Sequence, residues 1–473
     1  MPLPGITVER GERGPATLEP GDVSTLFAAV ITARGPVGTP VECWSWPQVR
    51  ARMGGHQGYT TLRTVEQYFR QSGGGRVVLS RLVGPDARHA TLALNDARGD
   101  AVLTLRAVGP GGDYHAVRCA VATTGNDCTI TLTDGDTTVL EGTYSSDLAA
   151  KAALDATGLV VAEPGAGTWP IDSMAATALS GGDDDRANIR DQHVVDAVSP
   201  AVLPADLGPG TLAAPGYTTF AVAQGLIGHA QATNRFVRFA APDTASAGTI
   251  ITLASQIRAL GRGAGWIQLL AGWPQIDVGG VTVAVSPEGV VAGREALTDR
   301  SSGPGPGQPA AHSFGAFDLS IIGVSQTYSP ADREALNDAG VSVIVNDRGE
   351  IFPEDAITAA DPHVWPQYSE VAGMRVAMAI EAQAREAMRP YRSRNMDAHG
   401  HLAAEVTKDL VAICADWHRR DALYGADETE AFAVEVETIP DRRRLVGHIA
   451  IRNTTSVQRI HLTLEQVATG DTI

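Results

Sequence analysis

The spacing of apolar residues changes twice along this chain of 473 residues, and this change limits the folds that the chain can adopt. Residues 61–79 show a helical spacing that stops at three glycines and gives way to an apolar strand. Residues 101–142 alternate between apolar and polar with period two, which is typical of a β-sandwich. Residues 191–345 return to alternating helices and strands, which favours a layered α/β domain. We therefore expect several units of different architecture, about three from the length of the chain.

The clearest helix–strand unit of the α/β region begins at Ser329. Ser329 can cap a helix, Pro330 suits its first turn, and Gly340 can end it. The β-branched run at 341–345 then predicts a strand. Repeated units of this kind are the basis for predicting an α/β layer.

Both ends of the chain are predicted to form exposed strands. Two long helices, at 371–389 and 401–423, lead into strands at 432–436 and 445–451. Beyond them, and again near residue 6, apolar and polar residues alternate. The alternating segments contain Ile6, Thr7 and Val8 at one end and Ile460, Leu462 and Leu464 at the other. Such edge strands present unpaired backbone groups to which another chain can add a strand.

The charge of the chain argues against two classes of partner. With 37 basic and 54 acidic residues the formal charge is −17, which disfavours general nucleic-acid binding and electrostatic binding to a membrane surface. Lysine occurs only at Lys151 and Lys408, and neither follows a glycine, so a phosphate-binding Gly-Lys-Ser/Thr loop is excluded. No secretion signal and no run of about 18 apolar residues is found. We expect a soluble protein that folds in a cytoplasm.

Sequence signatures of catalysis and of metal or cofactor binding are missing. The chain has no G-x-S-x-G nucleophile elbow, no H-E-x-x-H pair and no G-x-G-x-x-G loop. His399 and His401 supply two ligands, which leaves a tetrahedral metal site half empty. The carboxylates at 183–185 lack the spacing of a calcium loop and are interpreted as a solvated linker. We predict no catalytic, cofactor-binding or metal-binding residue, but a hydrolytic triad stays open because triads are recognised by geometry.

One basic cluster is conspicuous in this acidic chain. Arg385, Arg389, Arg392 and Arg394 lie at and after the end of the predicted helix 371–389. The cluster could contact an acidic partner. The alternative is a solvated helix end, where arginine complements the negative end of the helix dipole.

Short motifs in a fixed order resemble the tail sheath proteins of contractile phages and of related contractile injection systems. The similar segments are Pro-Gly-Ile-Thr-Val-Glu at 4–9, Ala-Arg-Gly-Pro-Val-Gly-Thr-Pro at 33–40, Met-Gly-Gly to Val-Val at 53–78, Trp-Pro at 273–274, Ser-Pro-Glu-Gly-Val-Val-Ala-Gly at 286–293 followed by Asp299, and Leu-Asn-Asp-Ala-Gly-Val at 336–341. Two segments depart from the family pattern. Residues 349–353 replace a Trp-Gly-Ala-Arg-Thr stretch, and the paired arginines of the next helix are reduced to Met374-Arg375.

The resemblance implies a multidomain fold of the α/β and α+β classes. It implies a subtilisin-like α/β middle domain without catalysis, an inserted β-sandwich, and a conserved core built from both ends of the chain with N- and C-terminal β-strand arms. The implied segments are an N-terminal linker arm at 1–20, the N-terminal part of the core at 21–95, the β-sandwich at 96–182, the subtilisin-like domain at 183–355, the C-terminal helical and strand part of the core at 356–443, and a C-terminal linker arm at 444–473.

The resemblance also implies a structural subunit that is not an enzyme and needs no cofactor. Sheath subunits stack as hexameric rings around a tail tube, join their neighbours by adding the arm strands to neighbouring sheets, and contract to drive the tube through the host envelope. The implied partners are further copies of the chain, the tail tube protein, and baseplate and tail terminator proteins, without nucleic acid or membrane insertion. The implied location is the virion tail, after assembly in the bacterial cytoplasm. The arginine cluster is then a candidate tube contact.

Other functions stay open at this point. The sheath could belong to a phage tail or to a phage-derived contractile injection system. A hydrolase would use the middle domain, and a glycan-binding protein would use the β-sandwich.

Overall fold

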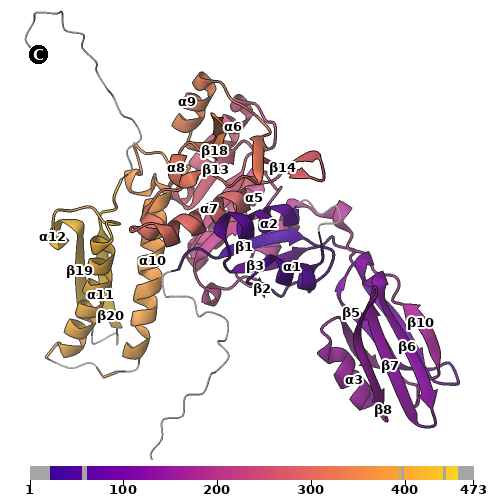
Figure 1. Ribbon diagram of the computed structural model, residues 1–473. Coiled ribbons are helices and arrows are strands. Elements are labelled where there is room, and N and C mark those ends of the chain that lie inside the picture. Colours follow the sequence, from indigo (N-terminus) through magenta and orange to yellow (C-terminus); the bar gives the residue numbers. More distant parts are fainter. Residues whose placement is uncertain (1–21, 56–60, 393, 396–398, 440–443, 456–473) are drawn as a thin grey trace, which may run out of the picture.

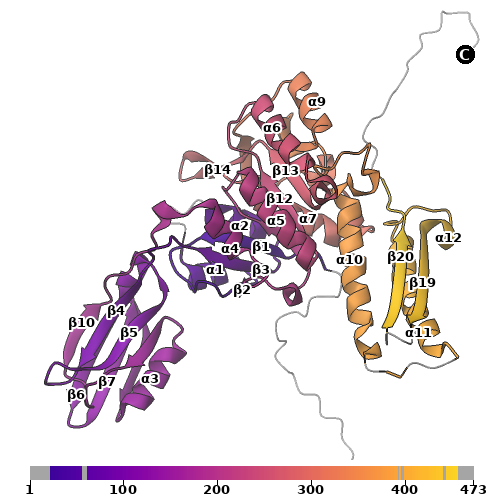
Figure 2. The same ribbon diagram turned by 180° about the vertical axis from the view of Figure 1, so that it is seen from behind.

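The computed structural model describes residues 22–55, 61–392, 394–395, 399–439 and 444–455. Figures 1 and 2 show three parts: a central body of helices around a large sheet, a strand unit on one side, and a helix–strand unit on the other. The strand unit runs from β4 (His89–Asn95) to β10 (Met174–Ala178), and the helix–strand unit begins with α10 (Val371–Ala387). The described residues therefore form a mixed α/β protein with several sheets, as the sequence predicted.

The central body is built on an eight-stranded sheet. Its order is β18-β17-β13-β12-β11-β1-β3-β2, parallel from β17 to β3 and antiparallel at the two outer strands. Strands from residues 21–95 and from residues 183–355, which the resemblance assigned to different units, thus join in one sheet. The strands are β1 (Leu26–Ile31), β2 (Val41–Cys43), β3 (Val77–Leu82), β11 (Gly210–Ala213), β12 (Arg235–Ala240), β13 (Ile267–Ala271), β17 (Val341–Asp347) and β18 (Glu350–Pro353).

Helices cover both faces of this sheet, and β1 shows the consequence for the sequence. Leu26 and Ala28 pack into one core cluster, while Phe27 and Ala29 pack into another, because successive side chains of a strand point to opposite faces. A strand buried on both faces reads as a continuous apolar run. The helices of the body are α1 (Trp46–Met53), α2 (Thr61–Ser72), α4 (Asp191–Ala197), α5 (Phe220–Thr233), α6 (Ala247–Arg258), α7 (Pro287–Ser301), α8 (His312–Gly315) and α9 (Pro330–Asp338).

The predicted unit at Ser329 is confirmed. The backbone N–H of Asp332 donates to Ser329 Oγ at 3.2 Å, Pro330 opens α9, and Gly340 follows with a φ of +81°. A small antiparallel sheet lies beside the body, in the order β15-β14-β16. Its strands are β14 (Pro274–Val278), β15 (Val281–Ala284) and β16 (Ile321–Val324).

The strand unit consists of two antiparallel sheets, β4-β5-β9 and β10-β6-β7-β8, that share one core cluster. It begins at His89, earlier than the expected boundary at residue 96, because β4 pairs with β5. The remaining elements are β5 (Ala101–Pro110), β6 (Val117–Thr124), β7 (Asp127–Asp134), β8 (Thr137–Tyr144), α3 (Asp147–Ala156) and β9 (Val160–Pro164).

Arg34, in the loop after β1, joins the strand unit to the body. Its guanidinium pairs with the carboxylates of Asp113 and Asp134 and lies 5.7 Å from the ring centroid of Tyr114. The Tyr114 hydroxyl accepts a hydrogen bond from the backbone N–H of Gly35 at 3.1 Å. The orientation of the strand unit is therefore set by a few directional contacts as well as by the two chain connections.

The return connection at 183–185 is not the solvated linker that we predicted. The carbonyl oxygen of Asp183 accepts a hydrogen bond from the N–H of Arg88 at 2.7 Å. The carbonyl oxygen of Asp184 accepts one from the N–H of Gly84 at 2.9 Å. These bonds use the main chain, so the run of acidic side chains gave no sign of them.

Helix α7 carries three buried carboxylates, and two of them are paired with arginine. Glu295 accepts a hydrogen bond from Nε of Arg238 on β12 at 3.1 Å. Asp299 accepts two from the guanidinium of Arg375 on α10, at 2.9 and 2.5 Å. The side chains of both pairs are at most 7% exposed. Glu288 is fully buried, and no cation pairs with it among the described residues.

We expect Arg375→Ala to lower stability strongly, because it leaves Asp299 buried without its cation. Loss of one partner of a buried pair typically removes about 3–5 kcal/mol of unfolding free energy. The matched control is Arg385→Ala on the same helix, where the arginine is exposed and pairs with Glu381. That control should change stability by about 0.5 kcal/mol or less. Urea unfolding of both variants measures the difference, and equal midpoints would contradict the assigned role.

We also expect stability to depend on pH through Glu288. Burial raises the pKa of its carboxyl from 4.5 to about 7, and neither carboxylate oxygen accepts a hydrogen bond from the described residues. The folded state therefore favours the neutral form, so unfolding free energy falls as pH rises from about 4.5 through 7. Glu288→Gln should be more stable than the parent chain at pH 8, by on the order of 3 kcal/mol, and similar to it below pH 4.5. Thermal unfolding across this range tests this, and a pH-independent difference would refute it.

Candidate functional site

The helix–strand unit presents a two-stranded sheet on a helix. β19 (Phe432–Ile439) and β20 (Arg444–Ile451) pair antiparallel and pack on α11 (His401–Arg419), and α12 (Glu428–Ala431) precedes them. Figures 1 and 2 show this hairpin beside α11, with α10 on the side of the unit that faces the body. One core cluster contains Phe236 of β12, Met378 of α10 and Trp417 of α11, so the unit is packed onto the body through α10.

The two strands have an apolar face and a polar face. Val434 and Ile449 are opposite each other and pack on the core cluster, whereas Glu435 and His448 are opposite each other and exposed. Each strand has one edge without a partner strand among the described residues. Such an edge carries backbone N–H and C=O groups that can pair with a further strand. The first part of the expected C-terminal arm, 444–451, therefore serves as one strand of this hairpin.

A groove of about 1000 Å³ runs along β20, between this strand, α11 and the end of α10. We call it the β20 groove. Its apolar lining comes from Leu402, Val406 and Leu410 of α11 and from Leu445 and Ile449 of β20. The groove lies next to an unpaired strand edge, so it offers apolar contacts for the side chains of an added strand. The sequence indicated the apolar face of α11 but not that part of this face borders an open groove.

The structure places the four predicted arginines around the end of α10, beside the carboxylates of the same unit. Three of them form ion pairs: Arg385 with Glu381 at 2.7 Å, Arg389 with Glu386 at 3.0 Å, and Arg394 with Glu405 at 2.6 Å. Arg385, Arg392 and Arg394 line the β20 groove, and Arg389 does not. All four are exposed, so each ion pair contributes little by itself.

The predicted arm residues cannot be placed. Ile6, Thr7, Val8, Ile460, Leu462 and Leu464 lie outside the described residues. The described part of the chain therefore contains a surface that can accept a strand, while the strands that would be added stay a prediction.

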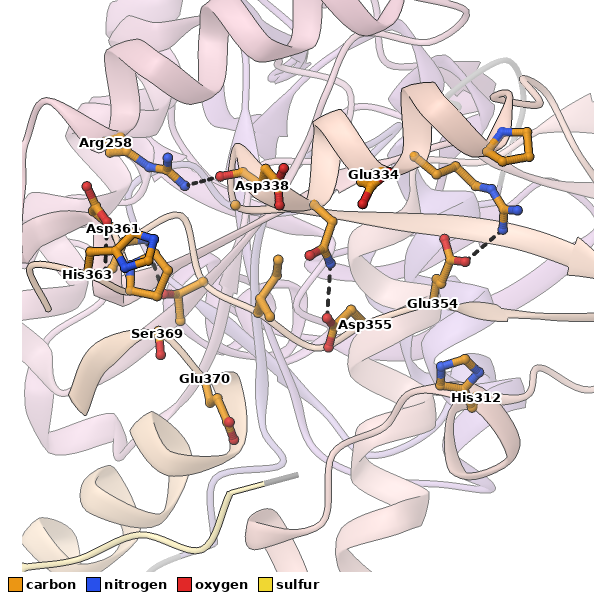
Figure 3. Close-up of a pocket in the computed structure, with 18 residues that line it drawn as sticks. Arg258, His312, Glu334, Asp338, Glu354, Asp355, Asp361, His363, Ser369 and Glu370 are labelled. Atoms are coloured by element: carbon orange, nitrogen blue, oxygen red, sulfur yellow. Dashed lines mark hydrogen bonds and ion pairs between the residues drawn. The ribbon is translucent and has the colours of Figure 1, made fainter. Parts of the chain in front are cut away.

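A polar cleft of about 900 Å³ lies between α9 and the segment that precedes α10 (Figure 3). We call it the acidic cleft, because two arginines, Arg258 and Arg333, face a larger set of carboxylates. That set consists of Glu334, Asp338, Glu354, Asp355, Asp361 and Glu370. Some of these groups pair within the cleft: Arg333 Nη1 contacts Glu354 Oε1 at 2.7 Å, and Arg258 Nη2 donates to the backbone carbonyl of Asp338 at 3.0 Å.

The acidic cleft also contains a serine and histidines, which bears on the hydrolase alternative. Ser369 Oγ donates to the carbonyl of Pro366 at 2.8 Å, and the backbone N–H of His363 donates to Asp361 at 2.9 Å. The serine hydroxyl is thus directed to the main chain, and the cleft does not assemble a serine–histidine pair. Among the described residues, no group of three or more His, Cys, Asp or Glu side chains is arranged to hold a metal ion. None of the described helices combines the length and the apolar character needed to cross a bilayer.

Comparisons with known proteins give matches in structure. The sequence matches no family model and no curated protein. The fold is similar to that of a sheath tail protein from Listeria innocua, with a TM-score of 0.67 and 13% identity over 91% of this chain and 92% of that one. It is also similar to a sheath tail protein from Desulfitobacterium hafniense, with a TM-score of 0.60 and 14% identity over 94% and 100% of the two chains.

A contractile injection system provides a further structural match. The contracted helical sheath of the anti-feeding prophage aligns with a TM-score of 0.54 and 16% identity over 98% of this chain and 100% of that one. All three alignments cover nearly the whole of both chains, so they include the body, the strand unit and the helix–strand unit. The resemblance drawn from the order of the sequence motifs is confirmed at the level of the fold. This chain therefore has the fold of the sheath proteins of contractile tails and contractile injection systems.

Proposed function

We propose that this chain is a structural subunit of a contractile tail sheath. In this proposal it polymerises as stacked hexameric rings around a tail tube and contracts to drive the tube through the host envelope, with no enzymatic activity. The observation that carries the proposal is the structural likeness to sheath proteins over more than nine-tenths of the chain. The alternative within the same class is the sheath of a phage-derived injection system. It is favoured by the likeness to the anti-feeding prophage sheath.

The proposed partners follow from this role. They are further copies of the chain, the tail tube protein, and baseplate and tail terminator proteins. One structural match comes from the baseplate assembly of the anti-feeding prophage, which supports association of such a fold with a baseplate. The proposed location is the virion tail, after assembly in the cytoplasm of a bacterial host.

The proposed domain arrangement keeps the boundaries expected from the sequence, with two adjustments that the strand pairing suggests. The inserted β-sandwich would begin at β4, and the C-terminal arm would begin after β20. A subtilisin-like topology for 183–355 is supported by the parallel order β11, β12, β13 and β17 with helices between the strands.

The proposed link between subunits is strand addition to the β19–β20 hairpin. The arm strands around Ile6 and Val8, or around Ile460 and Leu462, have the alternation that the hairpin requires. Their main chain would pair with the free edge of β20, and their apolar side chains would enter the β20 groove. Support comes from the free strand edge and the apolar lining of the groove beside it.

Deletion of residues 1–20, or of the residues after Arg459, should leave folded monomers that form no tubes. Negative-stain microscopy and sedimentation of purified protein measure polymerisation, and circular dichroism checks folding. A finer variant replaces Ile6 and Val8 by aspartate, and Thr7→Ser is the matched control that keeps the apolar alternation. Normal contractile tubes from either truncated chain would refute the arm proposal.

The proposed tube contact is the arginine cluster at Arg385, Arg389, Arg392 and Arg394. Three of them already pair with neighbouring glutamates. A tube contact would therefore have to replace these ion pairs with pairs between the arginines and acidic groups of the tube. Arg389 lies outside the β20 groove. A substitution of Arg389 therefore tests the tube contact without changing the surface proposed for strand addition.

Arg389→Glu should weaken co-sedimentation with the tube, more at low salt than at high salt, and leave polymerisation intact. The matched control is Arg106→Glu in the strand unit, where an exposed arginine pairs with Glu163. Equal tube binding by both variants would remove Arg389 from the proposed contact.

A further inference from the structure

Leu319 is the most exposed large apolar side chain among the described residues, at 98%. It lies at a groove of about 670 Å³ between α1, α2 and the small sheet, which we call the Leu319 groove. Ile322, at 50% exposure, lines the same groove, and Val281, at 62%, pairs in the sheet with Val278 of the lining. An apolar cluster of this kind on a folded surface is typical of a contact site for another protein.

The exposure of Leu319 is enforced by its neighbours. The backbone N–H of Asp318 donates to Gln71 Oε1 at 3.0 Å, and Asp318 Oδ1 accepts from Gln71 Nε2 at 2.7 Å. On the other side, Ser320 Oγ donates to Gln67 Oε1 at 3.1 Å. Both residues that flank Leu319 are therefore held on α2, so the leucine is fixed in the position that solvent reaches. A backbone held in this way at Leu319 loses little freedom on binding, which favours association.

The rim of the Leu319 groove carries three arginines against two carboxylates, Glu66 and Asp277, a net charge of +1 in a chain that is acidic as a whole. Arg50 of α1 and Arg63 and Arg70 of α2 line it. Arg70 pairs with Glu66 at 3.5 Å, and no ion pair is seen for Arg50 or Arg63 among the described residues. The groove therefore combines an apolar centre with cationic side chains that suit an acidic partner.

A second copy of this chain supplies such a partner surface. The acidic cleft carries six carboxylates against two arginines, a net charge of −4 with neutral histidine. Val364, at 60% exposure, follows the cleft residue His363 and offers an apolar contact at the border of the cleft. Glu334 and Asp338 lie on α9 at one wall of this cleft (Figure 3), and both are exposed.

We propose that the Leu319 groove of one subunit docks on the acidic cleft of the next. The two surfaces share no residue, so the contact is head-to-tail and repeats from copy to copy, as a ring or helix requires. This inference rests on the proposed polymeric function and adds a subunit contact that does not use the arms. It predicts that complementary charge on these two surfaces, as well as strand pairing, is needed for subunits to associate.

Charge reversal on each side tests the contact. The groove variant carries Arg50→Glu and Arg63→Glu, and the cleft variant carries Glu334→Arg and Asp338→Arg. Each variant alone should need at least a tenfold higher concentration to form sedimenting polymers, because the groove variant places two acidic surfaces opposite each other and the cleft variant brings the net charge of the cleft from −4 to zero. A chain with all four substitutions, or an equal mixture of the two variants, should polymerise near the parent concentration, because the new carboxylates of the groove then face the new arginines of the cleft.

Leu319→Asp tests the apolar part, and Leu148→Asp on α3 is the control, since Leu148 is also exposed, at 74%. Only Leu319→Asp should impair polymerisation, and thermal unfolding checks that every variant is folded. Polymerisation of the charge variants at the parent concentration, or loss without rescue in the combined chain, would overturn the contact while leaving the sheath proposal in place. Failure of the parent chain to polymerise would overturn both.

Discussion

The buried ion pair between Arg375 and Asp299 connects the part of the chain that can accept strands to the part that forms the body. Arg375 lies on α10, which also supports α11 and the β19–β20 hairpin through a shared core cluster. Asp299 lies on α7, which packs against α2 and the central sheet. Under the sheath proposal, a pull on the hairpin would pass through α10 and this pair into the body. Asp299 follows a segment that resembles the family pattern, whereas Arg375 lies in the one where a pair of arginines is reduced to one.

Two buried arginines hold loops of the body in place. Lysine occurs only twice in the chain, so arginine supplies nearly all of its basic side chains. The buried guanidinium of Arg81 donates to backbone carbonyls in the loop 32–35, and that of Arg235 donates to carbonyls at 203, 204 and 208. A planar group with five donors can satisfy several carbonyls at once, which an ammonium group does less well. The predominance of arginine over lysine therefore has a structural role, because buried arginines hold these loop carbonyls.

The sequence predicted local structure well where local physics decides it. The helix cap at Ser329, the starts of α10 and α11, and the alternation in β19 were all readable from spacing. The sequence could not predict that β1 and β11 pair, because periodicity does not identify partners that are distant along the chain. It indicated an arginine cluster but not the glutamates that pair with three of its members, although the i,i+4 spacing of Arg385 from Glu381 and the i,i+3 spacing of Arg389 from Glu386 were usable signals. The exposure of Leu319 follows from tertiary hydrogen bonds that no local pattern contains.

The proposed sheath role combines three surfaces with different physical functions. The β19–β20 hairpin offers directional main-chain bonding, the Leu319 groove and acidic cleft offer complementary charge, and the body holds them at fixed positions. A helical reconstruction by electron microscopy of polymers formed by the purified chain tests the central claim most directly. The account predicts ordered tubes in which strands from neighbouring subunits extend the β19–β20 sheet. A monodisperse chain, or tubes in which this sheet keeps only its own two strands, would contradict it.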